Sequence, residues 1–161
     1  MTKAHLTAIT RKTPSVPMRW LATNDRIVGR ALDYGCGKGY DADAYGMESY
    51  DPHYQPVMPV GPFETVTCNY VLNVVETVVG RLQVLQTIQY NLTPTGKAYI
   101  TVRNDKRALR GTTSKGTWQG HIVMNLPVVR AVAGYVMYQL DRNDGISESI
   151  IEARTYEEGA A

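Results

Sequence analysis

The chain has 161 residues, 43 % of them hydrophobic and 20 % charged, and its 17 basic and 15 acidic side chains give a formal net charge of +2. This length is typical of one domain, and no apolar run approaches the roughly 18 residues of a membrane-spanning helix, so a transmembrane protein is excluded. Two cysteines are too few for a disulfide framework, and the polar start does not resemble a secretory signal, so we expect a cytoplasmic protein. The small net charge does not indicate nucleic-acid binding.

The N-terminal part is predicted to be a segment that precedes the main domain. Pro14 and Pro17 lack amide donors and restrict the residues before them, so a helix is expected only from Met18 onward. We therefore divide the chain into an N-terminal segment, residues 1–27, and a single domain, residues 28–161.

Two short strands are predicted at the start of this domain. Residues 30–34 form a strand that leads into a glycine turn at 35–39, and a short helix follows at 41–45. Residues 48–51 form a second brief strand that ends at Pro52 and continues into a proline-rich connection. We expect little regular structure in that connection.

The middle of the chain has the clearest periodicity. Residues 64–69 alternate and are rich in β-branched side chains, which predicts a buried strand. A helix follows, ended by Thr93-Pro94-Thr95-Gly96. Apolar side chains recur on one of its faces and polar ones occupy the others: Val78, Leu82, Leu85, Ile88 and Leu92, against Arg81, Gln83, Gln86 and Gln89.

The C-terminal third is predicted to be mainly strands. Residues 97–103 complete a strand, helix, strand unit and therefore a parallel pairing, and residues 121–126 form an additional strand. Tyr135–Leu140 and Ser149–Arg154 flank the reverse-turn sequence Asn143-Asp144-Gly145, which predicts an antiparallel terminal hairpin. The expected fold is α/β, with a mostly parallel sheet and this hairpin at one edge.

The motif that indicates chemistry is Asp33-Tyr34-Gly35-Cys36-Gly37-Lys38-Gly39, with Asp51 at the end of the next predicted strand. Glycines allow positive φ and a close approach of a ligand to the backbone, while a carboxylate on the neighbouring strand accepts hydrogen bonds from ribose hydroxyls. The pattern predicts a nucleoside-containing cofactor. A nicotinamide fingerprint would read Gly-x-Gly-x-x-Gly, which this glycine spacing does not match.

Leu32–Gly39 resembles motif I of class I S-adenosylmethionine-dependent methyltransferases. Asp51, Asn69-Tyr70 and Pro94-Thr95-Gly96 follow in the order of that family's ribose-binding acid, active-site strand end and turn before the fifth strand. Three pieces, Leu32–Gly37, Tyr50–Tyr54 and Tyr70–Val75, resemble the small bacterial and phage methyltransferases associated with DNA phosphorothioation loci. The resemblance covers residues 11 to 105 and does not supply a methyl acceptor.

The resemblance implies an abbreviated Rossmann-like methyltransferase sheet with S-adenosyl-L-methionine as cofactor. Only twelve residues separate Asp51 from Glu64, so the family's third strand is expected to be missing. The implied cofactor-binding residues are Asp33, Gly35, Cys36, Gly37, Gly39, Asp51, Pro52 and Asn69. Asp51 would hold the ribose, the glycine turn would pass beside the methionine part, and Asp33 would orient the turn or meet the methionine ammonium.

Asn69 and Tyr70 are the candidate catalytic residues, because the resemblance places them near the sulfonium methyl group. No metal site is expected, since His5, His53 and His121 lack ligand spacing.

The expected activity is methyl transfer to an unidentified acceptor. The alternatives are a protein that binds or degrades S-adenosylmethionine without transferring its methyl group and, less favoured, a nicotinamide-dependent oxidoreductase. Either a monomer or a homodimer is compatible with the sequence.

The sequence is compatible with two different roles for several residues. Residues 1–27, with Arg11, Lys12 and Ser15, either cross the cofactor mouth or form a solvated basic tail. The adenine is covered by Met58, Val60 or Phe63. The remaining pairs of readings concern single residues: Trp118 and Gln119 as a lid or a core anchor, Asn73 as a cleft residue or a cap, His53 as a base or a turn residue, and Cys36 with Cys68 as buried thiols or a reactive pair.

Overall fold

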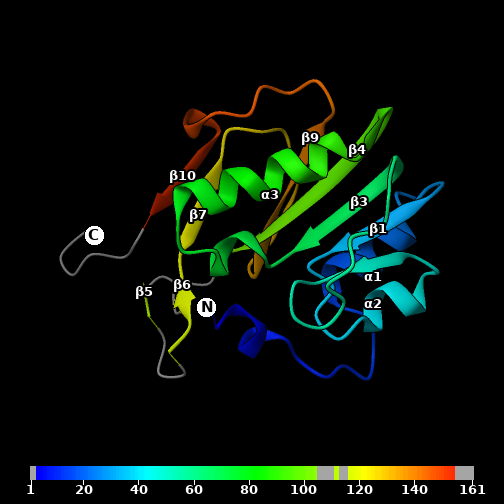
Figure 1. The fold of residues 1–161 in the computed structure, drawn as a ribbon, viewed down its shortest axis with the longest axis horizontal. Helices are drawn as coiled ribbons and strands as arrows, with labels where there is room; N and C mark the ends of the chain where they lie inside the picture. Colours follow the sequence, from blue (N-terminus) through cyan, green and yellow to red (C-terminus); the bar gives the residue numbers. More distant parts are fainter. Residues whose placement is uncertain (1–2, 105–110, 113–115, 155–161) are drawn as a thin grey trace.

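The computed structural model describes residues 3–104, 111–112 and 116–154. Its centre is a six-stranded sheet in the order β2-β1-β3-β4-β9-β8 (Figure 1). The strands are β1 (Ala31–Tyr34), β2 (Glu48–Tyr50), β3 (Phe63–Asn69), β4 (Leu92–Arg103), β8 (Val128–Ala131) and β9 (Tyr135–Asp141). β2, β1, β3 and β4 pair in parallel, whereas β9 is antiparallel to both β4 and β8. The predicted mostly parallel α/β sheet is confirmed.

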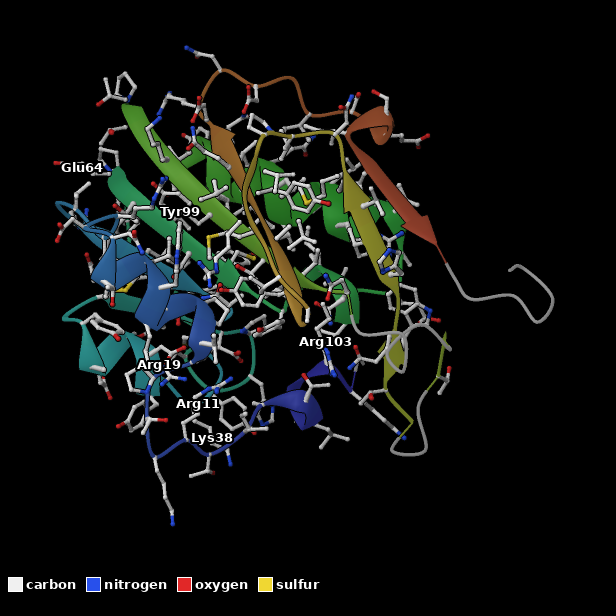
Figure 2. All side chains as sticks on the ribbon, turned by 180° about the vertical axis from the view of Figure 1, so that it is seen from behind. Arg11, Arg19, Lys38, Glu64, Tyr99 and Arg103 are labelled. Atoms are coloured by element: carbon white, nitrogen blue, oxygen red, sulfur yellow. The ribbon has the colours of Figure 1, made fainter. Side chains whose placement is uncertain are left out.

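Helices cover both faces of this sheet. The longest, α3 (Val78–Tyr90), lies across one face, and α1 (Val16–Thr23) with α2 (Tyr40–Ala44) lies on the other, as Figures 1 and 2 show from opposite sides. The alternation of a strand explains the two cores. On β4, Ala98, Ile100 and Val102 pack into the α3 side, while Tyr99 between them joins the α1 and α2 side.

The predicted terminal hairpin has different partners from those expected. β9 pairs along its length with β4 and forms its hairpin with β8, whereas β10 (Ile151–Arg154) pairs with β7 (His121–Met124) in a separate two-stranded sheet. Antiparallel pairing at the C-terminal end of the sheet is therefore confirmed, but the pairing of 135–140 with 149–154 was wrong. The reason is that the edges of β9 are already occupied, so the chain after its turn passes through η4 (Glu148–Ile150) to another partner.

The connection after β2 contains no further sheet strand. Between Asp51 and Pro62 the structure has only an isolated bridge from Asp51 to Gln55, so β2 is an edge of the sheet. This agrees with the expected loss of the family's third strand. Two shorter strands, β5 (Gly111–Thr112) and β6 (Trp118–Gln119), pair with each other in a small antiparallel ribbon.

The predicted apolar face of α3 is buried at Leu85 and Ile88, but two residues differ from the prediction. Arg81 was assigned to a polar face but is only 2 % exposed, while Val78 is exposed. The Arg81 guanidinium donates from Nη1 to the Val75 carbonyl at 2.6 Å and lies 5.5 Å from the centre of the Trp118 ring. An arginine with such partners is tolerated inside, because its hydrogen bonds and cation–π contact offset part of the desolvation.

The segment expected to terminate α3 is also different. The helix ends at Tyr90, but residues 93–96 belong to β4 and not to a separate turn. They lie where the β3–β4 register shifts between Phe63 and Thr65. The strand thus contains the Pro-Thr-Gly sequence as a bulge-like irregularity, which is where proline and glycine occur inside a sheet.

Candidate functional site

A cavity of about 880 Å³ opens at the edge where the parallel strands end. β1 delivers the glycine turn to it, β2 delivers Asp51, and β3 ends at Asn69. Of the implied cofactor-binding residues and the candidate catalytic residues, all but Gly39 line this one cavity: Asp33, Gly35, Cys36, Gly37, Asp51, Pro52, Asn69 and Tyr70. The parallel topology brings them together, because the carboxyl ends of parallel strands share one sheet edge.

The glycine turn is held by the neighbouring strand. The amides of Gly35 and Cys36 both donate to the Tyr50 carbonyl, at 2.7 and 2.9 Å. Gly35 has φ +80°, and a Cβ there would meet the Val71 side chain at 2.3 Å. Gly39 has φ +86° and precedes α2, but nothing lies within 4 Å of where its Cβ would be. Gly35 is required by conformation and space, and Gly39 by conformation alone.

Asp51 joins the glycine turn to the turn after β2. Its Oδ2 accepts from the Gly37 amide at 3.0 Å, and its Oδ1 accepts from the amides of His53 and Tyr54 at 2.9 and 3.0 Å. A carboxylate has about four acceptor positions. Three are used within the chain, so part of this side chain organises the site, a role that sequence spacing did not reveal.

Asp33 is the most perturbed carboxyl group of the site. It is buried beneath the turn, and its Oδ1 accepts from the Thr67 hydroxyl at 2.8 Å. Burial raises the pKa of Asp33 to about 7; the Thr67 hydrogen bond and the Arg11 charge lower that pKa, while the charges of Asp41 and Asp51 raise it. The group therefore titrates near neutral pH and favours a cationic partner in the cavity.

The sequence analysis missed Asp41, a buried carboxylate in the first turn of α2 that also lines the cavity. It accepts from the Ser15 amide at 2.8 Å and from the Ser15 hydroxyl at 2.6 Å. The only signal in the sequence was an acidic residue two positions after the glycine turn. Its partner lies 26 residues earlier, and no local pattern indicates such a pair.

Asn69 and Tyr70 form the cavity wall at the end of β3. Tyr70 has φ +61°, rare for a residue with a side chain, and its amide donates to the Thr101 carbonyl at 2.8 Å. Burial raises the pKa of Tyr70, so its hydroxyl is a neutral hydrogen-bond donor at physiological pH. The amide oxygen and nitrogen of Asn69 are both buried without a partner. Such strain and unmet hydrogen bonds are typical of functional sites.

The N-terminal strap, residues 4–12, runs along this edge of the sheet (Figure 2). Six of its residues line the cavity: Ala4, His5, Thr7, Ala8, Ile9 and Arg11. Two hydrogen bonds fix its end, from Lys38 Nζ to the Thr10 hydroxyl at 2.8 Å and from the Tyr40 hydroxyl to the Lys12 carbonyl at 2.9 Å. A tail free in solvent would not make these contacts. Arg103, at the end of β4, lines the cavity as well.

The structure distinguishes the two readings of several residues. Trp118 packs against the α3-side core and is absent from the described cavity lining, whereas its neighbour Gln119 lines the cavity. Asn73, 1 % exposed, also lines it, and its Nδ2 donates to Gln119 Oε1 at 3.1 Å. His53 lies in the turn whose amide binds Asp51, and its ring stacks on His5.

The cysteines behave as buried thiols. Neither Cys36 nor Cys68 is in a disulfide. Burial, with the charges of Asp33 and Asp51, raises the pKa of Cys36 to about 12, and burial also raises the pKa of Cys68. Both are thiols at neutral pH, so neither is an activated nucleophile.

The residues expected to cover an adenine lie elsewhere. Met58 packs against the α3-side core, Phe63 is completely buried in it, and Val60 is 83 % exposed. None of the three lines the cavity among the described residues. The cause is the short connection, which leads from the Asp51–Gln55 bridge to the start of β3 at Phe63.

The described residues contain no group of three or more His, Cys, Asp and Glu side chains arranged to hold a metal ion. No helix within residues 3–104, 111–112 and 116–154 has the length and apolar character of a membrane span.

No family model matches the chain, and no match was found among curated proteins. Solved structures do resemble it. One is the 1,6-didemethyltoxoflavin-N1-methyltransferase of Burkholderia thailandensis with bound 1,6-didemethyltoxoflavin and S-adenosylhomocysteine, with TM-score 0.52 and 15 % identity, covering 79 % of this chain and 76 % of that one. Another is the N-methyltransferase NodS of Bradyrhizobium japonicum in complex with S-adenosyl-l-homocysteine, with TM-score 0.48, 11 % identity, and coverage of 80 % and 85 %. The first likeness establishes the Rossmann-like methyltransferase fold.

Proposed function

We propose that this protein is an S-adenosylmethionine-dependent methyltransferase. The observation that supports it best is the convergence of the glycine turn, Asp51 and Asn69-Tyr70 on one cavity at the strand-end edge of a sheet with the methyltransferase fold. Ligands of open α/β sheets bind at that edge. At about 880 Å³, the cavity is at the upper end of the ~300–1,000 Å³ typical of small-molecule sites, enough for the cofactor and a small acceptor.

The charges of the cavity match the proposed cofactor. S-adenosylmethionine carries an ammonium, a carboxylate and a sulfonium. Asp33 and Asp41 offer negative charge beside the glycine turn, and Arg11, close enough to lower the pKa of Asp33, offers a positive charge for the carboxylate. The remaining acceptor position of Asp51 is available for a ribose hydroxyl. The residues present therefore fit the cofactor.

Catalysis would rest on positioning. Methyl transfer forms a bond from an acceptor lone pair to the methyl carbon while the carbon–sulfur bond breaks and its electron pair stays on sulfur. The sulfonium is already a good leaving group, so in-line alignment and exclusion of water supply much of the rate increase. Tyr70, a neutral donor, and Asn69, with two unpartnered amide atoms, are the residues that would orient the acceptor.

The membership of this chain among the small methyltransferases associated with DNA phosphorothioation loci is a further part of the proposal. It is supported by the resemblance of Leu32–Gly37, Tyr50–Tyr54 and Tyr70–Val75. In the structure, Gly35 and Gly37, Asp51 and Tyr70 from these three pieces line the same cavity. The acceptor itself does not follow from this resemblance.

Calorimetric titration with S-adenosylmethionine and S-adenosylhomocysteine tests the cofactor, with NADH as control ligand. We expect micromolar binding of the first two and none of NADH. Product analysis then separates the possible activities: S-adenosylhomocysteine indicates methyl transfer, methylthioadenosine or a lactone indicates cleavage, and unchanged cofactor indicates binding alone. A folded protein that binds neither sulfur compound contradicts the proposal.

A further inference from the structure

One end of the cavity is walled by two histidine rings that come from distant parts of the chain. His5 of the N-terminal strap and His53 of the turn after β2 are stacked, with ring centres 4.0 Å apart and an angle of 12° between their planes. The Tyr54 ring meets the His53 ring edge-on at 4.7 Å, and the Tyr54 hydroxyl donates to the His5 carbonyl at 3.5 Å. Both histidines line the cavity.

The strap lines the cavity on the side where the connection after β2 contributes few residues. Of the connection from Asp51 to Pro62, only Asp51, Pro52 and His53 line the cavity. Ala4, His5, Thr7 and Ala8 of the strap line it instead, and Ala8 lies 3.3 Å from the position of a Cβ on Gly37. The N-terminal strap therefore supplies the wall that the short connection leaves open.

The position of a bound nucleoside follows from the chemistry of ribose, if the proposed function is correct. The base is attached at C1′ and the methionine part through C5′ on C4′, at opposite ends of the ring. With the ribose hydroxyls on Asp51 and the methionine part beside the glycine turn and Asp33, the base points away from Asp33, toward Pro52 and His53. His53 is the residue on which the His5 ring stacks, and both line the cavity.

We propose that the stacked pair of His5 and His53 is the adenine-binding wall of the site, so that the cofactor site is complete only with the N-terminal strap in place. A purine has two flat faces, and stacking on aromatic side chains is a general way to bind it.

The strap is held loosely enough to admit a ligand. Its 3₁₀ turn, η1 (Ala4–Thr7), has no buried residue, and Leu6 and Ile9 are 46 % and 57 % exposed. Segments with few buried apolar contacts open at low free-energy cost. Contact with the base adds to the stability of the closed strap, so bound cofactor protects it from opening.

The test compares ring removal at two positions with a matched control. His5→Ala and His53→Ala are expected to weaken S-adenosylhomocysteine and adenosine binding by about ten- to hundredfold, the effect of removing an aromatic partner of a base. Leu6→Ala, on the same 3₁₀ turn but outside the described cavity lining, leaves both affinities within about twofold, as surface changes do. His5→Phe, which keeps a ring, restores most of the affinity.

A second measurement follows the strap itself. Lys3, Arg11 and Lys12 are trypsin sites within or beside it, and S-adenosylhomocysteine is expected to slow their cleavage in the wild-type protein but less in His5→Ala. If the wild-type protein binds the ligand and His5→Ala binds it equally well, the adenine wall is refuted while the proposed function stands. If the folded wild-type protein binds neither ligand, the proposed function fails, and the wall with it.

Discussion

The two halves of the cavity are built in different ways. The glycine-turn half comes from two segments close together in sequence, residues 33–41 and 51–53, and its backbone is fixed by hydrogen bonds to Tyr50 and Asp51. The far half comes from separate segments: Asn69, Tyr70, Asn73, Arg103 and Gln119. Its amide groups include three buried atoms without a hydrogen-bond partner, two on Asn69 and one on Asn73.

One half of the cavity is therefore preformed, whereas the other has polar groups that only a ligand would pair. Buried polar atoms without partners each cost about 1–3 kcal/mol, so the far half is less stable as it stands, and a ligand that satisfies its amides gains binding free energy there. In the glycine-turn half the polar groups are largely paired, so this half is already in the conformation that binds the cofactor. Substitutions in the two halves should therefore affect cofactor and acceptor separately.

The largest effect is expected at Asp33. Its pKa is 3.8 in the unfolded chain and about 7 in the folded one, so the folded state binds the proton more tightly. The corresponding stability is present below pH 4, falls as pH rises from about 4 to 7, and is lost above 7. Asp33→Asn removes this loss, and its free energy of unfolding at pH 8 should exceed that of the wild type by up to about 4 kcal/mol.

Urea unfolding of both proteins at pH 4 and pH 8 measures this difference. The gain should shrink toward zero at pH 4, where the wild-type carboxyl group is protonated. The same variant should bind S-adenosylmethionine more weakly at pH 8, because it lacks the charge that meets a cation. A stability difference independent of pH would contradict the raised pKa.

The glycine turn should show the next largest effect. Gly35→Ala adds a Cβ at positive φ and 2.3 Å from Val71, which we expect to cost about 3 kcal/mol in the free energy of unfolding and to abolish measurable cofactor binding. Gly39→Ala is the matched control, because it has the same conformation but open space. It should cost about 1 kcal/mol. Equal losses in the two variants would mean that the contact with Val71 is unimportant.

Asp51→Ala should weaken cofactor binding by about ten- to hundredfold, the equivalent of about 1.5–3 kcal/mol for a charge-assisted hydrogen bond. Because three backbone amides also lose their acceptor, its free energy of unfolding should fall as well. Calorimetry and urea unfolding measure the two effects. Unchanged affinity in a folded Asp51→Ala protein would remove Asp51 from the cofactor site.

The smallest effect on the cofactor is expected in the far half. Gln119→Ala removes the partner of Asn73 and should cost about 1 kcal/mol of stability, while S-adenosylhomocysteine affinity stays within about twofold. Once an acceptor is found, its KM should rise or kcat fall. A strong loss of cofactor affinity in this variant would show that the two halves are not separate.

Local patterns predicted the elements that depend on neighbouring residues. Alternation along residues 64–69 and the glycine spacing at 35–39 predicted β3 and the cofactor turn, because strand period and positive φ are properties of a few consecutive residues. The spacing of Asp33 and Asp51 predicted their common edge, because parallel strands end together. Periodicity failed for Arg81, whose burial depends on the Val75 carbonyl and the Trp118 ring.

Contacts between segments that are far apart in the sequence followed only from the tertiary structure. Three such contacts join residues that share no local pattern. They are the hydrogen bond from Ser15 to Asp41, the stack of His5 on His53, and the pairing of β9 with β8 and of β10 with β7. Such contacts depend on which surfaces remain uncovered after the sheet has formed. Local sequence patterns were enough to predict the parallel part of the sheet, the glycine turn and the place of the site. The antiparallel partners and the walls of the cavity depend on how the rest of the chain packs around that sheet.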